Sequence, residues 1–142
     1  MRIIFSILSI AYATGIFLFA DSSMVSDLSK FNPYSLLHIP LYGILTFLLV
    51  LSLMPLKFNP SGSINPSNPT NSNNPTDPSN WKIYFSLSGG IASIIAIADE
   101  IHQVYVPGRD GSVKDVLLDM MGISLALFLI FRFLKTQTSL IR

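Results

Sequence analysis

Four long apolar stretches constrain this chain more than any other feature of its sequence. Residues 3–20 and 41–56, for example, contain no charged side chain. A helix of about 20 apolar residues crosses the roughly 30 Å hydrocarbon core of a bilayer, and a helix satisfies its own backbone hydrogen bonds in lipid. The sequence therefore predicts an all-α fold, an integral membrane bundle of four transmembrane helices. The helices are expected at residues 3–20, 36–56, 81–98 and 113–133.

The composition agrees with a membrane protein and excludes several classes of site. Half of the 142 residues are hydrophobic and 12% are charged, whereas a soluble domain has about 25% charged residues. The net charge of +1 gives no reason to expect a nucleic-acid partner. The absence of cysteine excludes disulfides, thiolate nucleophiles and cysteine zinc sites. The length fits a single domain, residues 1–142.

The first apolar stretch has a second interpretation. Arg2, the apolar run and Ala20 before Asp21 are also typical of a cleaved signal peptide. Two features argue against cleavage: the run is long for a signal peptide, and Leu18, at position −3 from Ala20, is not small. We favour a retained helix; cleavage would leave three.

Residues 58–80, between the second and third stretches, consist mainly of Pro, Asn and Ser. Repeated prolines and the lack of an apolar period are incompatible with a packed element. We expect a disordered loop without chemistry, interrupting the domain.

Basic residues predict how the helices are oriented. Membrane proteins carry more Lys and Arg on the cytoplasmic side. Both termini and residues 58–80 are therefore predicted to be cytoplasmic, and residues 21–35 and 99–112 to be outside. All acidic residues except Asp77, and both histidines, then fall at or near the outer face. The basic residues on the predicted cytoplasmic side, six of nine, are Arg2, Lys57, Lys82, Arg132, Lys135 and Arg142.

The third stretch ends in a dense polar segment. We expect the acidic pair Asp99 and Glu100 to end its helix. Residues three and four apart on a helix share a face, so Asp99, His102 and Gln103 are predicted to point together and Glu100 to point a quarter turn away. In the turn that follows, marked by Pro107 and glycines, the guanidinium of Arg109 can bind two oxygens of a phosphate or carboxylate.

The fourth stretch carries two carboxylates one turn apart. Ser112 is well placed to cap this helix, and Asp115, Asp119 and Gly122 share one of its faces. Asp119 is about two turns inside, where an ionisable group is costly and normally faces a partner or a wet cavity. Gly122 allows close approach of another helix, as small residues do in membranes.

On the second stretch, His38 and Tyr42 share a face. Proline is tolerated in the first turn of a helix. Pro40 therefore predicts the start of this helix, with His38 just outside it at the outer rim.

Carboxylates with imidazoles can bind a divalent metal or act as general acid and base, but no particular metal follows from these residues. Structural interpretations stand beside the functional ones: helix ends at Asp99 and Glu100, a pairing of Arg109 with Asp110 or Asp99, and a polar plug between helices. The candidate catalytic residues are Asp99, Glu100, His102 and Asp119, and the candidate binding residues are His38, Tyr42, Gln103, Arg109, Ser112 and Asp115.

These positions resemble the motifs of the VanZ-like family over about residues 34–134. Residues 99–103 read Asp-Glu-x-His-Gln, followed by Pro-Gly-Arg and by Ser-x-x-Asp-x-x-x-Asp-x-x-Gly, and residues 36–42 read Leu-Leu-His-x-x-x-Tyr. The family often has Asn where Asp119 stands, and commonly an aromatic residue where this chain has Ile39.

The resemblance implies a small protein of the bacterial cytoplasmic membrane. The founding member is associated with resistance to teicoplanin, a glycopeptide that acts on lipid-linked cell-wall precursors at the outer face. The resemblance therefore implies a membrane lipid or lipid-linked head group as partner, but no particular reaction. An enzyme, a binding module, and an accessory or structural subunit all stay open. A transporter would need a homo-oligomer, because four short helices leave little room for a gated path.

Overall fold

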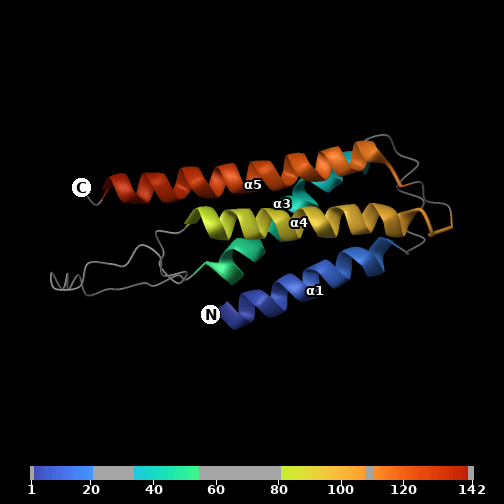
Figure 1. Ribbon diagram of the computed structural model, residues 1–142, viewed down its shortest axis with the longest axis horizontal. Coiled ribbons are helices and arrows are strands. Elements are labelled where there is room, and N and C mark those ends of the chain that lie inside the picture. Colours follow the sequence, from blue (N-terminus) through green and yellow to red (C-terminus); the bar gives the residue numbers. More distant parts are fainter. Residues whose placement is uncertain (1, 21–33, 55–80, 108–110, 141–142) are drawn as a thin grey trace.

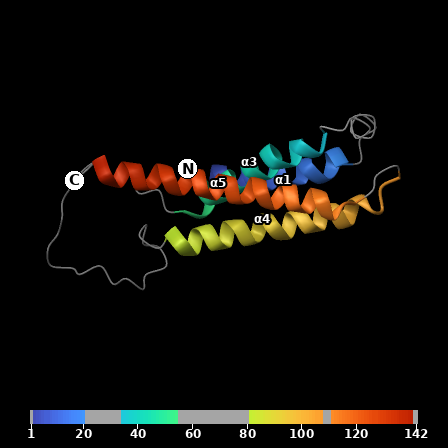
Figure 2. The same ribbon diagram turned by 90° about the horizontal axis from the view of Figure 1, so that it is seen from above.

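The structure is a computed structural model that describes residues 2–20, 34–54, 81–107 and 111–140. Consecutive helices run antiparallel, side by side (Figures 1 and 2). The central helix is α3, which packs against α1, α4 and α5. The elements are α1 (Arg2–Ala20), the 3-10 turn η1 (Tyr34–Leu37), α3 (His38–Leu53), α4 (Trp81–Gln103) and α5 (Val113–Leu140).

The predicted all-α membrane bundle is confirmed. By length and composition, α1, α4 and α5 are each able to cross a membrane, and α3 is an apolar helix of 16 residues. Since η1 runs directly into α3, residues 34–53 rise about 32 Å at the usual rises of the two helix types. That length matches the roughly 30 Å hydrocarbon core of a bilayer.

Two predicted helix boundaries are wrong. The acidic pair does not end α4, which continues to Gln103. Asp99 and Glu100 are only 2% and 6% exposed, because their side chains bond inside the bundle rather than reaching out to water. The second error concerns α3, which starts at His38 and not at Pro40. A proline in the first turn costs no helical hydrogen bond there, and η1 leads the chain into the helix.

Other boundaries have simple local causes. Met54 is extended, with φ −71° and ψ 126°, as expected for a residue that precedes a proline, and α3 therefore ends at Leu53. The last helix, α5, extends beyond Phe133 to Leu140. No Gly or Pro interrupts this extension. The predicted loop at residues 58–80 lies outside the described residues.

The core between the helices is small and draws on every helix. Ala92 and Ala96 are fully buried, so α4 approaches its neighbours closely, as small residues allow in membranes. Large apolar side chains cover the outside of the bundle, as lipid contact requires. One buried cluster consists of Ile16, Tyr42, Leu45, Ala92, Ala96 and Ile123. A second consists of Val50, Met54, Tyr84 and Phe85, from α3, its C-cap and α4.

Packing of α1 supports the retained-helix interpretation. Ile16 belongs to the shared core, and the Tyr12 hydroxyl donates to the Leu41 carbonyl oxygen at 3.2 Å. The Arg2 guanidinium donates to the carbonyl oxygens of Ser52 and Leu53 at 3.3 and 2.9 Å. These carbonyls are left without helical partners at the end of α3. Arg2 therefore links the start of α1 to the end of α3, a contact that the sequence did not predict.

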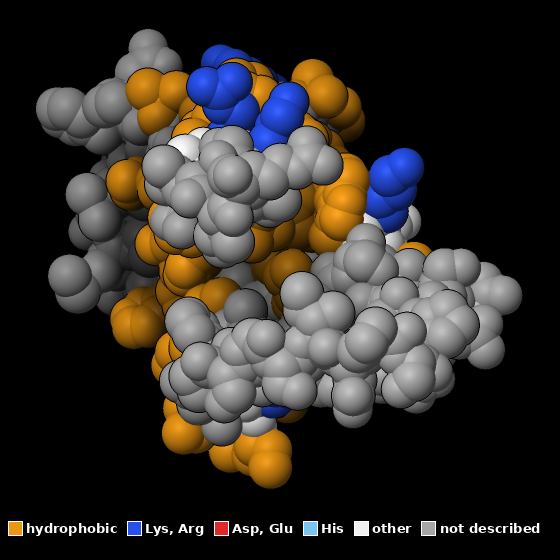
Figure 3. Space-filling model, turned by 90° about the vertical axis from the view of Figure 1, so that its left-hand side faces the viewer, with side chains coloured by type: hydrophobic (Ala, Val, Ile, Leu, Met, Phe, Trp, Pro, Cys, Tyr) orange, Lys and Arg blue, Asp and Glu red, His pale blue; other side chains and the backbone are white. Residues whose placement is uncertain are grey.

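Charges separate along the bundle as predicted, within the described residues. Figure 3 looks onto the end where α1 begins and α5 finishes, and shows Lys and Arg side chains but no acidic side chain among the coloured residues. The four described acidic residues are at the opposite end, with both histidines: Asp99, Glu100, Asp115 and Asp119. Which end faces the cytoplasm stays a prediction.

Helices α3 and α5 come closest at Gly122. A Cβ at this position would lie 3.0 Å from the Ile39 Cα and would collide with the Ile39 carbonyl oxygen. Both atoms belong to the backbone, so no side chain can turn away to make room. The close approach predicted for Gly122 is therefore present.

We expect Gly122→Ala to lower the free energy of unfolding by about 1–3 kcal/mol, because the added methyl pushes α5 away from α3. Gly90→Ala is the matched control, since nothing lies within 4 Å of its added Cβ. It should be neutral or stabilising by up to about 1 kcal/mol. Thermal unfolding in detergent measures both; equal behaviour of the two variants would contradict the assigned contact.

Candidate functional site

Three helices bring eight of the ten predicted site residues together at one end of the bundle. We call this group the polar cluster. His38 and Tyr42 come from α3, and the start of α5 faces the last turn of α4 across them. The polar cluster consists of His38, Tyr42, Asp99, Glu100, Gln103, Ser112, Asp115 and Asp119.

A buried pair joins α3 to α5. His38 Nδ1 lies 2.9 Å from Asp119 Oδ1, and the two residues are 6% and 0% exposed. When Asp119 is ionised it can only accept, and Nδ1 of His38 then carries the hydrogen in this bond. Asp119 thus has the partner that its depth in an apolar helix demanded.

A second network joins α3 to α4. The Tyr42 hydroxyl donates to Asp99 Oδ2 at 3.3 Å. Gln103 Nε2 donates to the same oxygen at 3.0 Å and to Glu100 Oε1 at 3.2 Å. The buried Gln103 therefore holds the two carboxyl groups of α4 on the same side of the helix.

The end of α4 is fastened to the start of α5 through Glu100. The Ser112 backbone N–H donates to Glu100 Oε2 at 2.8 Å. Ser112 also caps α5 as predicted, because its hydroxyl accepts from the Lys114 backbone N–H at 3.2 Å. Gly111 is needed beside them, since a Cβ there would lie 2.5 Å from the Glu100 carbonyl oxygen.

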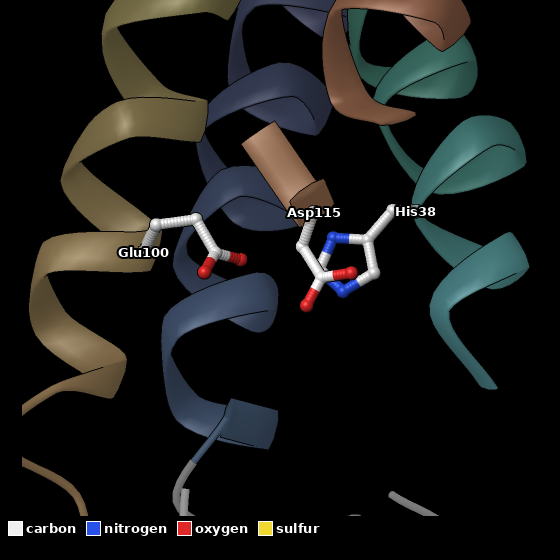
Figure 4. Close-up of side chains that lie close together, drawn as sticks. All are labelled: His38, Glu100 and Asp115. Atoms are coloured by element: carbon white, nitrogen blue, oxygen red, sulfur yellow. The ribbon is translucent and has the colours of Figure 1, made fainter. Parts of the chain in front are cut away.

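His38, Glu100 and Asp115 meet at the centre of the polar cluster, one from each of three helices (Figure 4). One potential ligand atom from each side chain lies within 4.8 Å of the other two. Imidazole nitrogen and carboxylate oxygen can hold a divalent ion or transfer a proton. Within the described residues, no other three His, Asp or Glu side chains bring potential ligand atoms this close together.

The predicted grouping on α4 is only partly right. Asp99 and Gln103 point together, but Glu100 joins them and His102 does not. His102 packs edge-on against Phe17 of α1 at 5.7 Å between ring centroids, and its buried Nδ1 has no hydrogen-bond partner within the described residues. Each residue turns a helix by about 100°, so Gln103 lies between Asp99 and Glu100, whereas His102 lies beyond Asp99.

Arg109, the predicted anion ligand, lies outside the described residues.

An apolar groove between α3 and α5 was not predicted. Its volume is about 770 Å³. Ile39, Pro40 and Gly122 line the end nearest the polar cluster, and Met54 and Leu134 line the far end. Hydropathy cannot distinguish a groove from a flat apolar surface. Small residues on the facing helices, Gly43 on α3 and Ala126 on α5, were the available signal.

A comparison with protein-family models matches residues 4–135 to the family described as VanZ/LLP1. The chain belongs to the VanZ/LLP1 family. The match extends over all four helices, including α1 from its third residue onward. No curated protein and no solved structure matches the chain.

Membership of the VanZ/LLP1 family confirms the resemblance inferred from the polar motifs. Together with the apolar helices, it identifies a VanZ-like membrane protein. The four-helix bundle is the scaffold on which this VanZ/LLP1 protein assembles the polar cluster.

We expect His38→Leu to lower the free energy of unfolding by about 3–5 kcal/mol, because it leaves Asp119 buried without its partner. The double variant His38→Leu/Asp119→Leu should recover most of this loss, since it removes both polar groups. Denaturant unfolding in detergent measures the variants.

His102→Leu provides the control for a histidine at the same end, and it should cost much less. A double variant no more stable than His38→Leu alone would show that the two residues are not energetically coupled.

Proposed function

We propose that this VanZ/LLP1 protein binds an envelope lipid, with the head group at the polar cluster and the hydrocarbon chain in the groove between α3 and α5. One observation carries the proposal: the groove begins where the polar cluster ends. Ile39 follows His38 directly, and Gly122 lies one helical turn after Asp119. A polar site continuous with an apolar groove is complementary to an amphiphile.

The lining of the groove supports a hydrocarbon occupant. Its residues are apolar along the whole length, and several, including Phe47 and Phe133, are largely exposed on the outside of the bundle. The groove therefore opens toward lipid, and a chain can enter sideways without leaving the membrane.

The length of the groove favours a long chain. From Ile39 to Met54 along α3, and from Gly122 to Leu134 along α5, it extends about 18–22 Å at 1.5 Å per residue. One leaflet contributes about 15 Å, half of the hydrocarbon core. A chain that fills the groove thus reaches past the bilayer centre, and a polyprenyl-type lipid, the carrier class of lipid-linked precursors, is long enough to do so.

The polar cluster suits a head group rich in hydrogen-bond donors. Asp99 and Glu100 accept from hydroxyl, amide or ammonium groups, and Gln103 can do both. Carboxylates repel phosphate, so a phosphorylated head group needs a cation nearby, and Arg109 is the residue proposed for this role. The acids and His38 also supply groups for general acid–base chemistry, so turnover of the bound lipid extends the same proposal.

Filling the groove should prevent lipid binding. We expect Ala126→Trp to reduce labelling by a photoreactive polyprenyl phosphate at least severalfold, because the indole occupies the space of the chain. Ala126 lines the groove, whereas Ser124 on the same helix is exposed and does not. Ser124→Trp is therefore the matched control and should label like the wild type.

The labelling is measured on the full chain in phosphatidylcholine vesicles. Equal labelling of the two tryptophan variants would refute the groove as the binding site.

We further propose that the polar cluster faces outside and that the protein lowers susceptibility to teicoplanin through this lipid. Expression in a susceptible Gram-positive host should raise the inhibitory concentration, and Asp99→Asn should remove most of the increase because it weakens the hold on the head group. Lys82→Gln, an exposed residue at the opposite end, should keep the effect.

All variants are compared at equal abundance in membranes. If susceptibility follows abundance alone, the protein is a structural or accessory subunit and the polar cluster is a plug between helices.

A further inference from the structure

We propose that His38, Glu100 and Asp115 bind a first-row divalent metal ion, with Asp119 as the residue that orients His38. The inference deepens the proposed function, on which it rests only for the role of the ion toward a head group. Four side chains on three helices make up the site itself.

The three ligand atoms are already close to the required positions. Since all lie within 4.8 Å of one another, some point is about 2.8 Å or less from each of them, whereas zinc ligands lie at about 2.0–2.2 Å. A shift of less than about 1 Å in each side chain closes this difference. Three protein ligands leave at least one position open, as in catalytic rather than structural zinc sites.

The pair of His38 and Asp119 has the form of a supported metal ligand. A histidine that binds a metal through one ring nitrogen almost always donates its other N–H to a carboxylate or carbonyl. His38 Nδ1 is hydrogen-bonded to Asp119 Oδ1 at 2.9 Å, so Nε2 is the nitrogen that remains for the ion.

Asp119 also provides an observation independent of the three ligands. It is fully buried, and its Oδ2 has no hydrogen-bond partner within the described residues. A buried carboxylate oxygen in this state costs free energy. A positive ion bound to the other nitrogen of the His38 ring would stabilise the negative charge on Asp119.

Glu100 is held in place for the same role. Its oxygens accept from Ser112 N–H at 2.8 Å and from Gln103 Nε2 at 3.2 Å. Each carboxylate oxygen has two acceptor positions, so these bonds fix the group and still leave a lone pair for a metal. Asp115, in the first turn of α5, is only half-buried, which gives the ion a path from the membrane surface.

The ligand set indicates the class of metal. One imidazole and two carboxylates suit Zn²⁺ or Mn²⁺ better than Ca²⁺ or Mg²⁺, which prefer all-oxygen sites. Such an ion would reverse the sign of the local charge in a group of carboxylates. It would therefore allow a phosphate to approach a site that otherwise repels it.

The test is metal binding by the full chain in phosphatidylcholine nanodiscs without any envelope lipid. After chelator treatment, Zn²⁺ is titrated by calorimetry and Mn²⁺ by electron paramagnetic resonance. We expect one ion per chain. Glu100→Gln and Asp115→Asn should weaken binding at least tenfold, and Asp119→Asn about 10–100-fold, the usual effect of removing an outer partner.

Histidine variants provide the matched comparison. His38→Gln should abolish binding, and His102→Gln should bind like the wild type, because His102 packs against Phe17 instead. In the wild type, the Mn²⁺ signal should also show coupling to one imidazole nitrogen, a result that does not depend on any variant folding.

The inference is overturned if the wild type binds neither ion, if no nitrogen coupling is seen, or if Glu100→Gln and Asp115→Asn bind like the wild type. Its failure is separable from that of the proposed function. Lipid labelling without metal binding would reject only the ion, and metal binding with labelling unaffected by Ala126→Trp would reject only the lipid groove.

Discussion

Where α5 crosses α3, the backbone of Gly122 lies against that of Ile39 with no side chain between them. On one side of this contact the helices are close enough for His38 and Asp119 to form a buried pair. On the other side, small residues leave the groove open toward lipid. This single backbone contact thus fixes the position of the polar cluster relative to the groove. Opening it would disturb both at once.

The membrane makes the polar cluster more informative than it would be in a soluble protein. Lipid offers no hydrogen bonds to a stray carboxyl group, so buried acids need partners within the bundle. The four described acidic residues lie at the same end of the bundle, two on α4 and two on α5. Hydrogen bonds from Gln103 to Asp99, and from the Ser112 N–H to Glu100, orient the two acidic side chains of α4. Such support is expected when side-chain positions matter, as they do for binding or catalysis.

The sequence predicted the helices and most of the polar cluster because both depend on local periodicity. Spacing of three and four residues placed Tyr42 with His38 and Asp119 with Asp115. The spacing rule failed for His102. This side chain packs against Phe17 of α1 and therefore does not point with Asp99 and Gln103. Hydropathy also ended α4 too early, since it assumes that acids seek water. The groove depends on which apolar residues face each other, and no local pattern encodes that.

The position of His38 has a consequence for the membrane itself. His38 is the first residue of α3, and η1 adds a further rise of about 8 Å toward the same end. The polar cluster therefore lies below the level at which the polypeptide leaves the bundle. Polar groups at such depth draw water and head groups inward and thin the bilayer around them. We therefore expect the lipid around this end of the bundle to deform, at a free-energy cost that depends on the thickness of the host bilayer.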